Sequence, residues 1–339
     1  MPIKLFIHKL INKENLNQPQ IEEVMHEIMS GQARKEDVAS FLLALRAKGS
    51  TVEEITGAAR IMRKFVVPIK TKHKEILDTC GTGGDRKDTF NISTLVAFVV
   101  AGCDVAVAKH GNRSVTSKCG SADVLEALGV DVGVEDAHMK ECLDEIGIAF
   151  LFAQKLHPAM KNVAAVRKEL GVETIFNILG PLTNPANATH QVLGVYSRDL
   201  VEPMAQVLKN LGLKKALVMH GADGLDEITT TDITFISEFN GKDIVSYDIS
   251  PDELGIPLAK PEDLIGGDIE NSVKIFNSIL KGEGGPKRDI VVLNAAYALY
   301  TVGKVKSISD GLQVASVSID SKSAQQKLQA LKEFTRSGR

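Results

Sequence analysis

The segment of residues 76–128 constrains the fold of this chain more than any other part of it. Two short apolar runs, 76–80 and 104–108, are each followed by a polar loop and then by an apolar stretch of helical length. This alternation predicts the order strand, loop, helix, strand, loop, helix, which is typical of a parallel sheet in an α/β fold. Both loops then lie at the carboxyl ends of parallel strands, where open α/β sheets bind their ligands.

The two loops have the composition of an anion-binding site. The first, Gly-Thr-Gly-Gly-Asp at residues 81–85, allows a ligand to approach the main chain closely. The helix predicted to begin near Asn91 directs its unpaired N–H groups and the positive end of its dipole toward the same space. The second loop, residues 109–114, adds the fixed positive charges of Lys109 and Arg113. Together the loops predict a site for a ligand with several phosphate groups.

Two common phosphate-binding fingerprints do not fit the first loop. The dinucleotide-binding fingerprint and the Walker A loop, each aligned on Gly81, both require glycine at the position of Arg86. For this loop alone, a tight turn without a ligand is an alternative. The basic second loop favours the anion site over that alternative.

Three motifs together resemble those of the anthranilate phosphoribosyltransferase family. They are Gly-Thr-Gly-Gly-Asp at 81–85, Thr-Phe-Asn-Ile-Ser-Thr at 89–94 and Lys-His-Gly-Asn-Arg-Ser at 109–114, and the resemblance extends over nearly the whole chain. It implies a small all-helical N-terminal domain and a large α/β domain with a mostly parallel central sheet, the nucleoside phosphorylase and class II phosphoribosyltransferase type of fold.

The resemblance also implies domain boundaries and an assembly. Residues 1–72, with about 170–189, would form a helical domain through which two chains dimerise. Residues 73–169 and 190–339 would form the α/β domain that binds 5-phosphoribosyl 1-pyrophosphate. The implied reaction is Mg²⁺-dependent transfer of the phosphoribosyl group to the amine of anthranilate, giving N-(5-phosphoribosyl)anthranilate and pyrophosphate, a step of tryptophan biosynthesis.

The family motifs assign ligand-binding roles to individual positions. The acceptor anthranilate would be bound by Gly81, Asn112 and Arg167. No general base is identified; His110 is a candidate, and a packing or substrate-lining role is its alternative. The positions assigned to 5-phosphoribosyl 1-pyrophosphate are Gly81, Gly84, Asp85, Thr89, Asn91, Ile92, Ser93, Thr94, Lys109, His110, Gly111, Asn112, Arg113, Ser114, Val115, Thr116, Ser117 and Ser121.

An acidic pair is the candidate metal site. Asp226 and Glu227 follow a predicted strand at 215–220, and carboxylates with phosphate oxygens are the ligands that Mg²⁺ prefers. A solvated surface turn is the alternative for two adjacent carboxylates. The resemblance implies that this pair and the Ser93 hydroxyl bind Mg²⁺.

The chain departs from the family pattern near the acceptor segment. Asn162 stands where histidine is common and Ala165 where proline is common. These differences bear on affinity for the acceptor, not on the phosphoribosyl site.

Composition bears on two alternative functions and on location. A net charge of −3 in 339 residues argues against a nucleic-acid-binding relative without catalysis. A pyrimidine nucleoside phosphorylase is the other alternative, and the long phosphate-loop signature argues against it. The four cysteines form no C-x-x-C pair. The apolar run at the N-terminus, residues 5–7, is too short for a signal peptide's apolar region, and no segment has the length of a membrane span. We therefore expect a cytoplasmic protein with reduced cysteines.

Periodicity predicts the remaining elements. Residues 1 to about 70 have only helical patterns, with Ser50 and Glu53 as a capping box. Residues 240–267 are rich in turn residues and have no assigned element. The predicted strands are 148–152, 192–196, 215–220 and an outer strand at 234–239, and the predicted helices are 135–146, 156–170, 200–211, 271–280, 290–300, 307–318 and 323–334.

Overall fold

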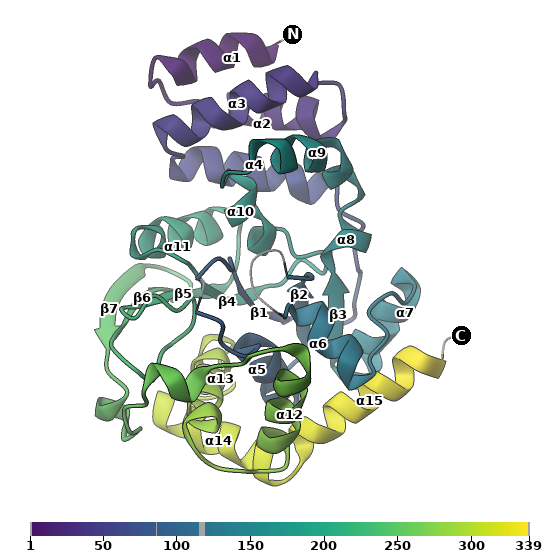
Figure 1. Cartoon of the computed structure of the whole chain (residues 1–339), viewed down its shortest axis with the longest axis vertical. Coiled ribbons are helices and arrows are strands. Elements are labelled where there is room, and N and C mark those ends of the chain that lie inside the picture. Colours follow the sequence, from purple (N-terminus) through teal and green to yellow (C-terminus); the bar gives the residue numbers. More distant parts are fainter. Residues whose placement is uncertain (1, 86, 115–118, 338–339) are drawn as a thin grey trace.

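One seven-stranded sheet, in the order β3-β2-β1-β4-β5-β6-β7, forms the middle of the molecule (Figure 1). The computed structural model describes residues 2–85, 87–114 and 119–337. The strands from β3 to β5 pair in parallel, whereas β6 and β7 are antiparallel, so the predicted mostly parallel sheet is confirmed. The strands are β1 Leu77–Gly81, β2 Val107–Gly111, β3 Ile148–Phe152, β4 His190–Gly194, β5 Lys215–Gly221, β6 Thr234–Phe239 and β7 Ile244–Ile249.

Two buried apolar clusters lie on opposite faces of this sheet. Because side chains alternate along a strand, Leu217 and Met219 of β5 belong to one cluster and Ala216 and Val218 to the other. The helices of the first cluster are α5 Ile92–Ala101, α6 Ser121–Leu128, α7 Asp136–Glu141, α12 Ile269–Leu280, α13 Pro286–Thr301, α14 Ile308–Asp320 and α15 Ser323–Ser337. Those of the second are α1 Pro2–Ile11, α2 Gln18–Met29, α3 Lys35–Lys48, α4 Val52–Lys64, α9 Lys161–Leu170, α10 Phe176–Leu179 and α11 Val201–Asn210.

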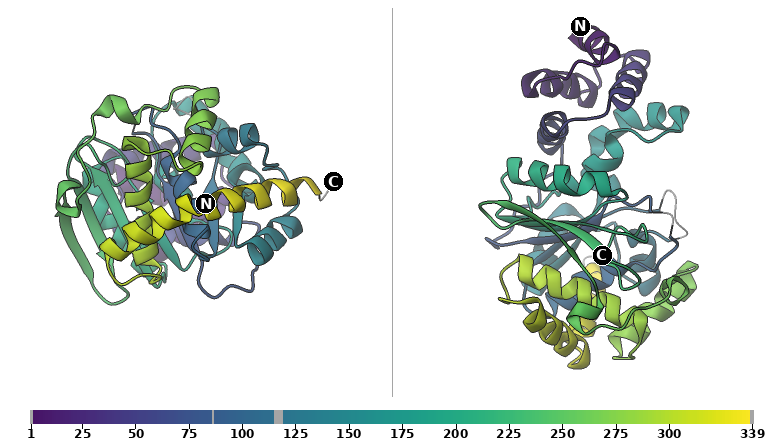
Figure 2. Two further views of the ribbon diagram at one scale, coloured as in Figure 1. Left: turned by 90° about the horizontal axis from the view of Figure 1, so that it is seen from below. Right: turned by 90° about the vertical axis from the view of Figure 1, so that its left-hand side faces the viewer.

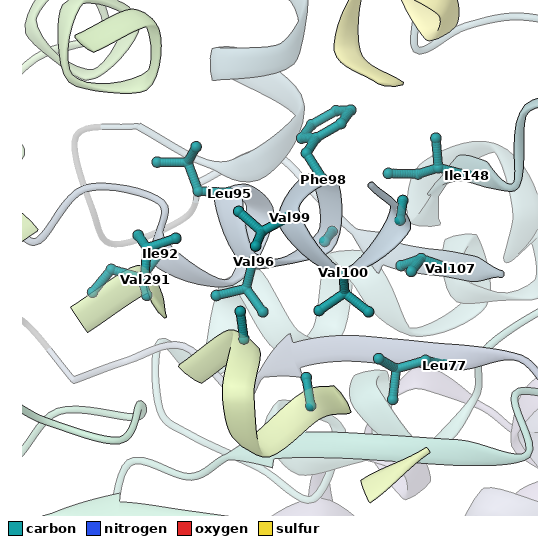
Figure 3. Packing of buried hydrophobic residues seen from close by; sticks show 14 of the residues in the cluster. Leu77, Ile92, Leu95, Val96, Phe98, Val99, Val100, Val107, Ile148 and Val291 are labelled. Carbon is teal, nitrogen blue, oxygen red and sulfur yellow. The ribbon is translucent and has the colours of Figure 1, made fainter. Parts of the chain in front are cut away.

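Helix α5 is the centre of the first cluster. All of its residues except Ser93 are buried, as expected for a helix that is apolar on every side. Val96 and Val100 point toward the strand that carries Leu77, and Phe98 points the other way (Figure 3). Burial on both sides fixes the N-terminus of α5, and therefore the motif at 91–94, against the sheet.

The N-terminal helices form a bundle that is separated from the sheet by α10 and α11 (Figure 2). Helices α9 and α10 lie far along the chain, yet α3 packs against α9 and α4 against α10 and α11. The capping box of α4 is at Thr51 and Glu54, one residue after the predicted pair at Ser50 and Glu53. Glu54 is the residue used because its carboxylate is fully buried and also accepts the N–H of Leu16 at 2.9 Å.

The predicted elements differ from the structure in further places, among them β2, which begins three residues after its predicted start, and α13, which begins four residues before its own. Strand β4 begins at His190, two residues before its predicted start, and β6 is not the outer strand. The edge strand is β7, which lies in the unassigned region and pairs with β6 through a tight Asn240–Asp243 turn. Its side chains are mostly exposed or half-buried, so its apolar signal is weak.

Two predicted helices are also divided. The first, at 135–146, is α7 followed by a π-helical segment, Cys142–Ile146. The second, at 156–170, is short α8, Ala153–Leu156, then a 3-10 turn at Pro158–Met160 and α9. Among the described helices, none has the length and apolar character that crossing a membrane requires.

Candidate active site

The carboxyl ends of β1 and β4 carry two glycines that lie against the same acidic residue. A Cβ atom on Gly81 would lie 2.3 Å from Oδ2 of Asp226, and one on Gly194 would lie 1.5 Å from the carbonyl oxygen of Asp226. The same Oδ2 accepts the N–H of Gly83 at 2.9 Å. Thus the loop after β5 packs directly onto the glycine loop, and any larger side chain at these two strand ends would displace it.

The glycine loop itself has the open backbone that its sequence predicts. Gly83 and Gly84 have φ angles of +64° and +86°, in the left-handed region, and a side chain on either would meet no atom within 4 Å. Asp85 is half-buried and near Asp226. The loop continues to Thr89, whose backbone forms an isolated bridge to Ile265.

Three carboxylates crowd the space beside this loop. Burial and the charge of Asp85 raise the pKa of Asp226 to about 7. Burial and the charge of Asp226 raise the pKa of Glu227 well above its usual value, although Lys109 opposes this. Within the described residues, no three His, Cys, Asp or Glu side chains form a complete metal cage. The adjacent carboxylates of Asp226 and Glu227 fit Mg²⁺, because this ion binds through one or two carboxylates, keeps several waters and takes phosphate oxygens from its substrate.

The first turn of α5 connects the carboxylates with the basic residues. The N–H of Ser93 donates to Oε1 of Glu227 at 3.1 Å, and the hydroxyl of Ser93 accepts from Nζ of Lys109 at 3.2 Å. Asn91 donates from Nδ2 to the carbonyl of Cys119 at 3.1 Å. In the described part of the chain, Oδ1 of Asn91 and the hydroxyl of Thr94 are buried without a hydrogen-bond partner. Buried polar atoms are rarely left so, and a bound ligand would satisfy them.

Lys109 lies beneath the loops and not at their surface. It is 4% exposed, and its ammonium donates to the carbonyl oxygen of Thr79 as well as to Ser93. Burial lowers its pKa, while Asp78 and then Glu227 are among the groups that raise it. Lys109 is therefore a buried positive charge next to the acidic residues.

The next residue of β2, His110, is paired with a second histidine. Nε2 of His110 lies 3.0 Å from Nε2 of His157, and the backbone N–H of His110 donates to the buried carboxylate of Asp78 at 3.1 Å. Burial, His157 and Lys109 lower the pKa of His110 to about 3, and burial lowers that of His157 to about 4. Both rings are therefore neutral, and one donates its proton to the other. The prediction missed His157, for which a histidine before Pro158 was the only sequence signal.

The rest of the basic loop is bound to the helix that follows it. The carbonyl of Asn112 accepts from the hydroxyl of Ser121 at 3.1 Å, and the N–H of Ser114 donates to Asp123 at 3.2 Å. The Arg113 guanidinium donates to Asp123 at 2.9 Å and to both oxygens of Glu126 at 2.6 Å. These carboxylates raise the pKa of Arg113, whose charge they already neutralise.

Gly111 is the last residue of β2. A Cβ atom on Gly111 would lie 2.4 Å from the Ser121 hydroxyl, so the end of β2 requires glycine. Val115, Thr116 and Ser117 lie outside the described residues.

Arg167 lies in the last turn of α9, away from both loops along the chain. Its Nη2 donates to Oδ1 of Asn177 at 3.4 Å, and its guanidinium lies 5.5 Å from the ring centroid of Phe176. Burial lowers its pKa. Within the described residues, the side chain of Arg167 thus contacts Asn177 and Phe176 of α10. These contacts do not link it to Gly81 or Asn112, the other two predicted acceptor-binding positions.

The two departures from the family pattern have different environments. Nδ2 of Asn162 donates to the carbonyl of Met29 at 2.8 Å, so this side chain links α9 to the N-terminal bundle. Ala165 is exposed on α9. Asn162 therefore has a packing role between helices in this structure.

The segment before α12 also contacts the glycine loop, which the sequence did not predict. The N–H of Gly266 donates to the carbonyl of Asp88 at 2.8 Å, and a Cβ atom on Gly266 would lie 2.4 Å from the backbone nitrogen of Phe90. The site thus depends on residues after β1, β2 and β5 and on this fourth segment.

Comparisons with known proteins agree with this architecture. The model described as "Glycosyl transferase family, a/b domain" matches residues 73–325, and the one described as "Glycosyl transferase family, helical bundle domain" matches residues 4–66. The chain is 52% identical over 335 residues to anthranilate phosphoribosyltransferase of Acetivibrio thermocellus, covering 99% of this chain and 97% of that one.

Solved structures give the same result. The anthranilate phosphoribosyltransferase of Thermus thermophilus superposes with a TM-score of 0.92 at 42% identity, over 97% of this chain and 99% of that one. The enzyme of Saccharomyces cerevisiae, solved in complex with PRPP (5-phosphoribosyl 1-pyrophosphate) and Mg, superposes with a TM-score of 0.91 at 26% identity, over 99% and 98% of the two chains. By its fold and by its sequence, the chain belongs to the anthranilate phosphoribosyltransferase family.

Proposed function

We propose that this chain transfers the phosphoribosyl group of PRPP to the amine of anthranilate and releases pyrophosphate. The observation that carries the proposal is the packing of Asp226 onto Gly81 and Gly194. That packing brings a carboxylate pair beside a glycine loop, a helix N-terminus and a buried lysine, which are the groups needed to hold a polyphosphate. The relatives described above are named for this reaction.

The donor occupies the two loops and the start of α5 in this proposal. The unpartnered oxygens of Asn91 and Thr94 support it, because each is buried and directed at no other described group. The open conformations of Gly83 and Gly84 let phosphate oxygens reach backbone N–H groups. The donor-binding positions remain those assigned from the family motifs, from Gly81 to Ser121.

Ser93, Asp226 and Glu227 are the proposed Mg²⁺ ligands. When bound, the ion neutralises charge on the pyrophosphate leaving group. The raised pKa values of Asp226 and Glu227 are consistent with this assignment, because burial and the neighbouring carboxylates both disfavour their charged forms. Lys109 balances part of that charge from below and donates to the Ser93 hydroxyl.

The acceptor is held by Gly81, Asn112 and Arg167 in this proposal. The anthranilate nitrogen attacks C1 of the ribose as the bond from C1 to pyrophosphate breaks, and the nitrogen then loses a proton. His110 is a weak base, because burial and its neighbours lower its pKa to about 3. Alignment of the two substrates and electrostatic stabilisation of the leaving group therefore supply most of the rate.

Assembly and location complete the proposal. Residues 1–72, with about 170–189, form a dimerisation domain, and the exposed apolar side chains of Leu5, Ile11 and Leu43 on α1 and α3 support a partner surface there. All four cysteines are buried and form no disulfide, which supports a reducing, cytoplasmic environment.

The proposal is tested by following anthranilate fluorescence. Addition of PRPP and Mg²⁺ to the purified chain should consume the fluorescence, and omission of either should prevent this. A parallel reaction with a pyrimidine nucleoside and inorganic phosphate tests the phosphorylase alternative. Phosphorolysis of the nucleoside without loss of anthranilate would overturn the proposal.

A further inference from the structure

A buried asparagine on α13 contacts the backbone next to the proposed metal-binding pair. Asn294 is 1% exposed and lies 66 residues from Ile228, the residue that directly follows Glu227. Its Oδ1 accepts the N–H of Ile228 at 2.9 Å, and its Nδ2 donates to the carbonyl of Ile228 at 2.8 Å. One side chain thus satisfies both backbone groups of Ile228, as a neighbouring strand would.

The amide is itself fixed by its own helix. Nδ2 of Asn294 also donates to the carbonyl of Ile290 at 2.8 Å, one turn earlier in α13. This third hydrogen bond determines which end of the amide faces which backbone group of Ile228. Because the side chain is fully buried and fully bonded, its replacement would leave Ile228 with an unpaired N–H and an unpaired carbonyl.

The loop that carries the acidic pair needs such support. Asp226 and Glu227 lie close to Asp85, and the repulsion among these carboxylates favours their separation. Inside the loop, Oδ2 of Asp223 accepts from the Thr229 hydroxyl at 2.7 Å, which fixes the loop's own shape. Asn294 connects that loop to the body of the domain.

Helix α13 also packs against α5, whose first turn is part of the proposed donor site. Val291, three residues before Asn294 and therefore on a neighbouring part of the same helix face, belongs to the same buried cluster as Ile92 of α5 (Figure 3). One helix face therefore contacts both the start of α5 and the loop of the carboxylates. The distance between these two parts of the site depends on α13.

We propose that Asn294 is a positioning residue that holds Asp226 and Glu227 in register with the start of α5 and so sets the affinity for PRPP with Mg²⁺. The inference rests on the proposed function. It assigns no contact between Asn294 and a substrate. Its effect should be confined to binding of the donor with its metal ion.

The test replaces the amide with an apolar group of the same shape. Asn294→Leu removes all three hydrogen bonds, and Asn294→Ala does so while leaving space that water can enter. Calorimetric titration with PRPP and Mg²⁺ should give a Kd raised about tenfold or more in both variants, consistent with loss of buried hydrogen bonds. The KM for anthranilate should change by less than about twofold.

Thr301→Val is the matched control. Thr301 is also a buried polar residue of α13, and its hydroxyl donates to the carbonyl of Tyr297 at 2.8 Å within the helix. This variant removes one hydrogen bond, so it should lose less stability than the Asn294 variants, and it should bind the donor with Mg²⁺ as the unchanged chain does. Equal weakening in the control, or an unchanged Kd in folded Asn294 variants, would overturn the inference.

Hydrogen exchange of the unchanged chain keeps the test decisive if neither variant folds. The amide of Ile228 should exchange slowly without any ligand, because Asn294 binds it; rapid exchange at Ile228 would contradict the proposal. Failure of the proposed function is recognised separately, since the unchanged chain would then leave anthranilate fluorescence constant.

Discussion

The two phosphate loops follow neighbouring parallel strands, yet different parts of the chain hold them in place. The basic loop after β2 is bound by the helix that directly follows it, with Arg113 only 10 and 13 residues from Asp123 and Glu126. The glycine loop after β1 is bound from far away, with Gly83 143 residues from Asp226. Gly266, from the segment before α12, is a second distant contact.

The conformation of one loop is therefore fixed by local contacts, and that of the other by contacts with distant parts of the chain. A loop held by its own helix can form as soon as that local segment folds. A loop held by residues from β4, β5 and the segment before α12 is correct only when the whole domain is assembled. Changes that disturb distant contacts of the glycine loop should therefore impair donor binding more than changes within the basic loop.

The largest effect on donor binding is expected for Gly194→Ala, which disturbs a distant contact of the glycine loop. The added Cβ would lie 1.5 Å from the carbonyl oxygen of Asp226, so the loop after β5 must move. We expect kcat/KM for PRPP to fall by about a hundredfold or more, because overpacking of this kind costs about 1–3 kcal/mol and here displaces the acidic pair. Gly284→Ala is the control, since nothing lies within 4 Å of its Cβ position and its φ is not in the left-handed region. Activity close to that of the control would contradict the role of this packing.

Gly266→Ala tests the second distant contact. Its Cβ would lie 2.4 Å from the Phe90 nitrogen and 2.7 Å from the Thr89 carbonyl carbon, both in backbone that cannot give way as a flexible side chain would. The KM for PRPP should rise about tenfold, or about 1.4 kcal/mol, while the KM for anthranilate changes less. Steady-state kinetics with each substrate varied in turn measures this, again beside Gly284→Ala. A larger effect on anthranilate would show that the segment serves the acceptor.

The pair of His110 and His157 is a distant contact of the basic loop, and its contribution to stability can be tested through its dependence on pH. The pKa values of His110 and His157 are lowered to about 3 and about 4, so the unfolded chain binds protons that the folded chain does not. Their contribution to stability is present above about pH 6.5 and is lost as pH falls below it. His157→Gln should reduce the loss of unfolding free energy between about pH 7.5 and about pH 5 by about 1–2 kcal/mol. Urea unfolding at both pH values measures this difference in unfolding free energy. The same pH dependence in the variant and in the unchanged chain would argue against a buried neutral histidine pair.

The smallest effect is expected for Glu126→Gln. The variant removes one of the two carboxylates that hold Arg113, and Arg113 and Glu126 are 41% and 39% exposed at their side chains. Exposed ion pairs contribute about 0–1 kcal/mol, so stability should fall by no more than that. The affinity for PRPP should stay the same or rise by up to about threefold, because Arg113 becomes available for phosphate. A loss of about tenfold would mean that Glu126 orients Arg113 toward the donor.

The same distinction explains what could be predicted from sequence. The order of strands, loops and helices at 76–128 was predicted correctly because their apolar runs and glycines act locally, although β2, Val107–Gly111, lies three residues later than the predicted run at 104–108. Asp226 and Ser121 were predicted as site residues, but the other partners of these loops were not predicted. Gly194, Gly266, His157 and Asn294 have ordinary local sequence, and their roles arise only when distant segments meet.

Two smaller differences between expectation and structure have the same origin. The capping box of α4 is at Thr51 because Glu54 is drawn into a buried network with Leu16 and Lys48, which no local pattern distinguishes from Ser50 and Glu53. The role of Arg113 as a phosphate ligand stays a prediction from its charge and from the family motif, but its ion pairs in the structure could not be predicted. Its bidentate pairing with Glu126 depends on the angle at which α6 leaves the loop.

The second apolar cluster has a consequence for how the chain is made on the ribosome. Val163 and Val166 of α9 and Phe176 of α10 share one buried cluster with Ile21 and Phe41 of the N-terminal bundle. About 115 residues separate the end of α4 from the end of α10, which at about 5–20 residues per second is roughly 6 to 23 s of synthesis. During that interval α1–α4 have been synthesised, but part of their apolar surface has no partner yet. Helices α1–α4 are therefore among the parts of the molecule that wait for later segments before their apolar surface is covered.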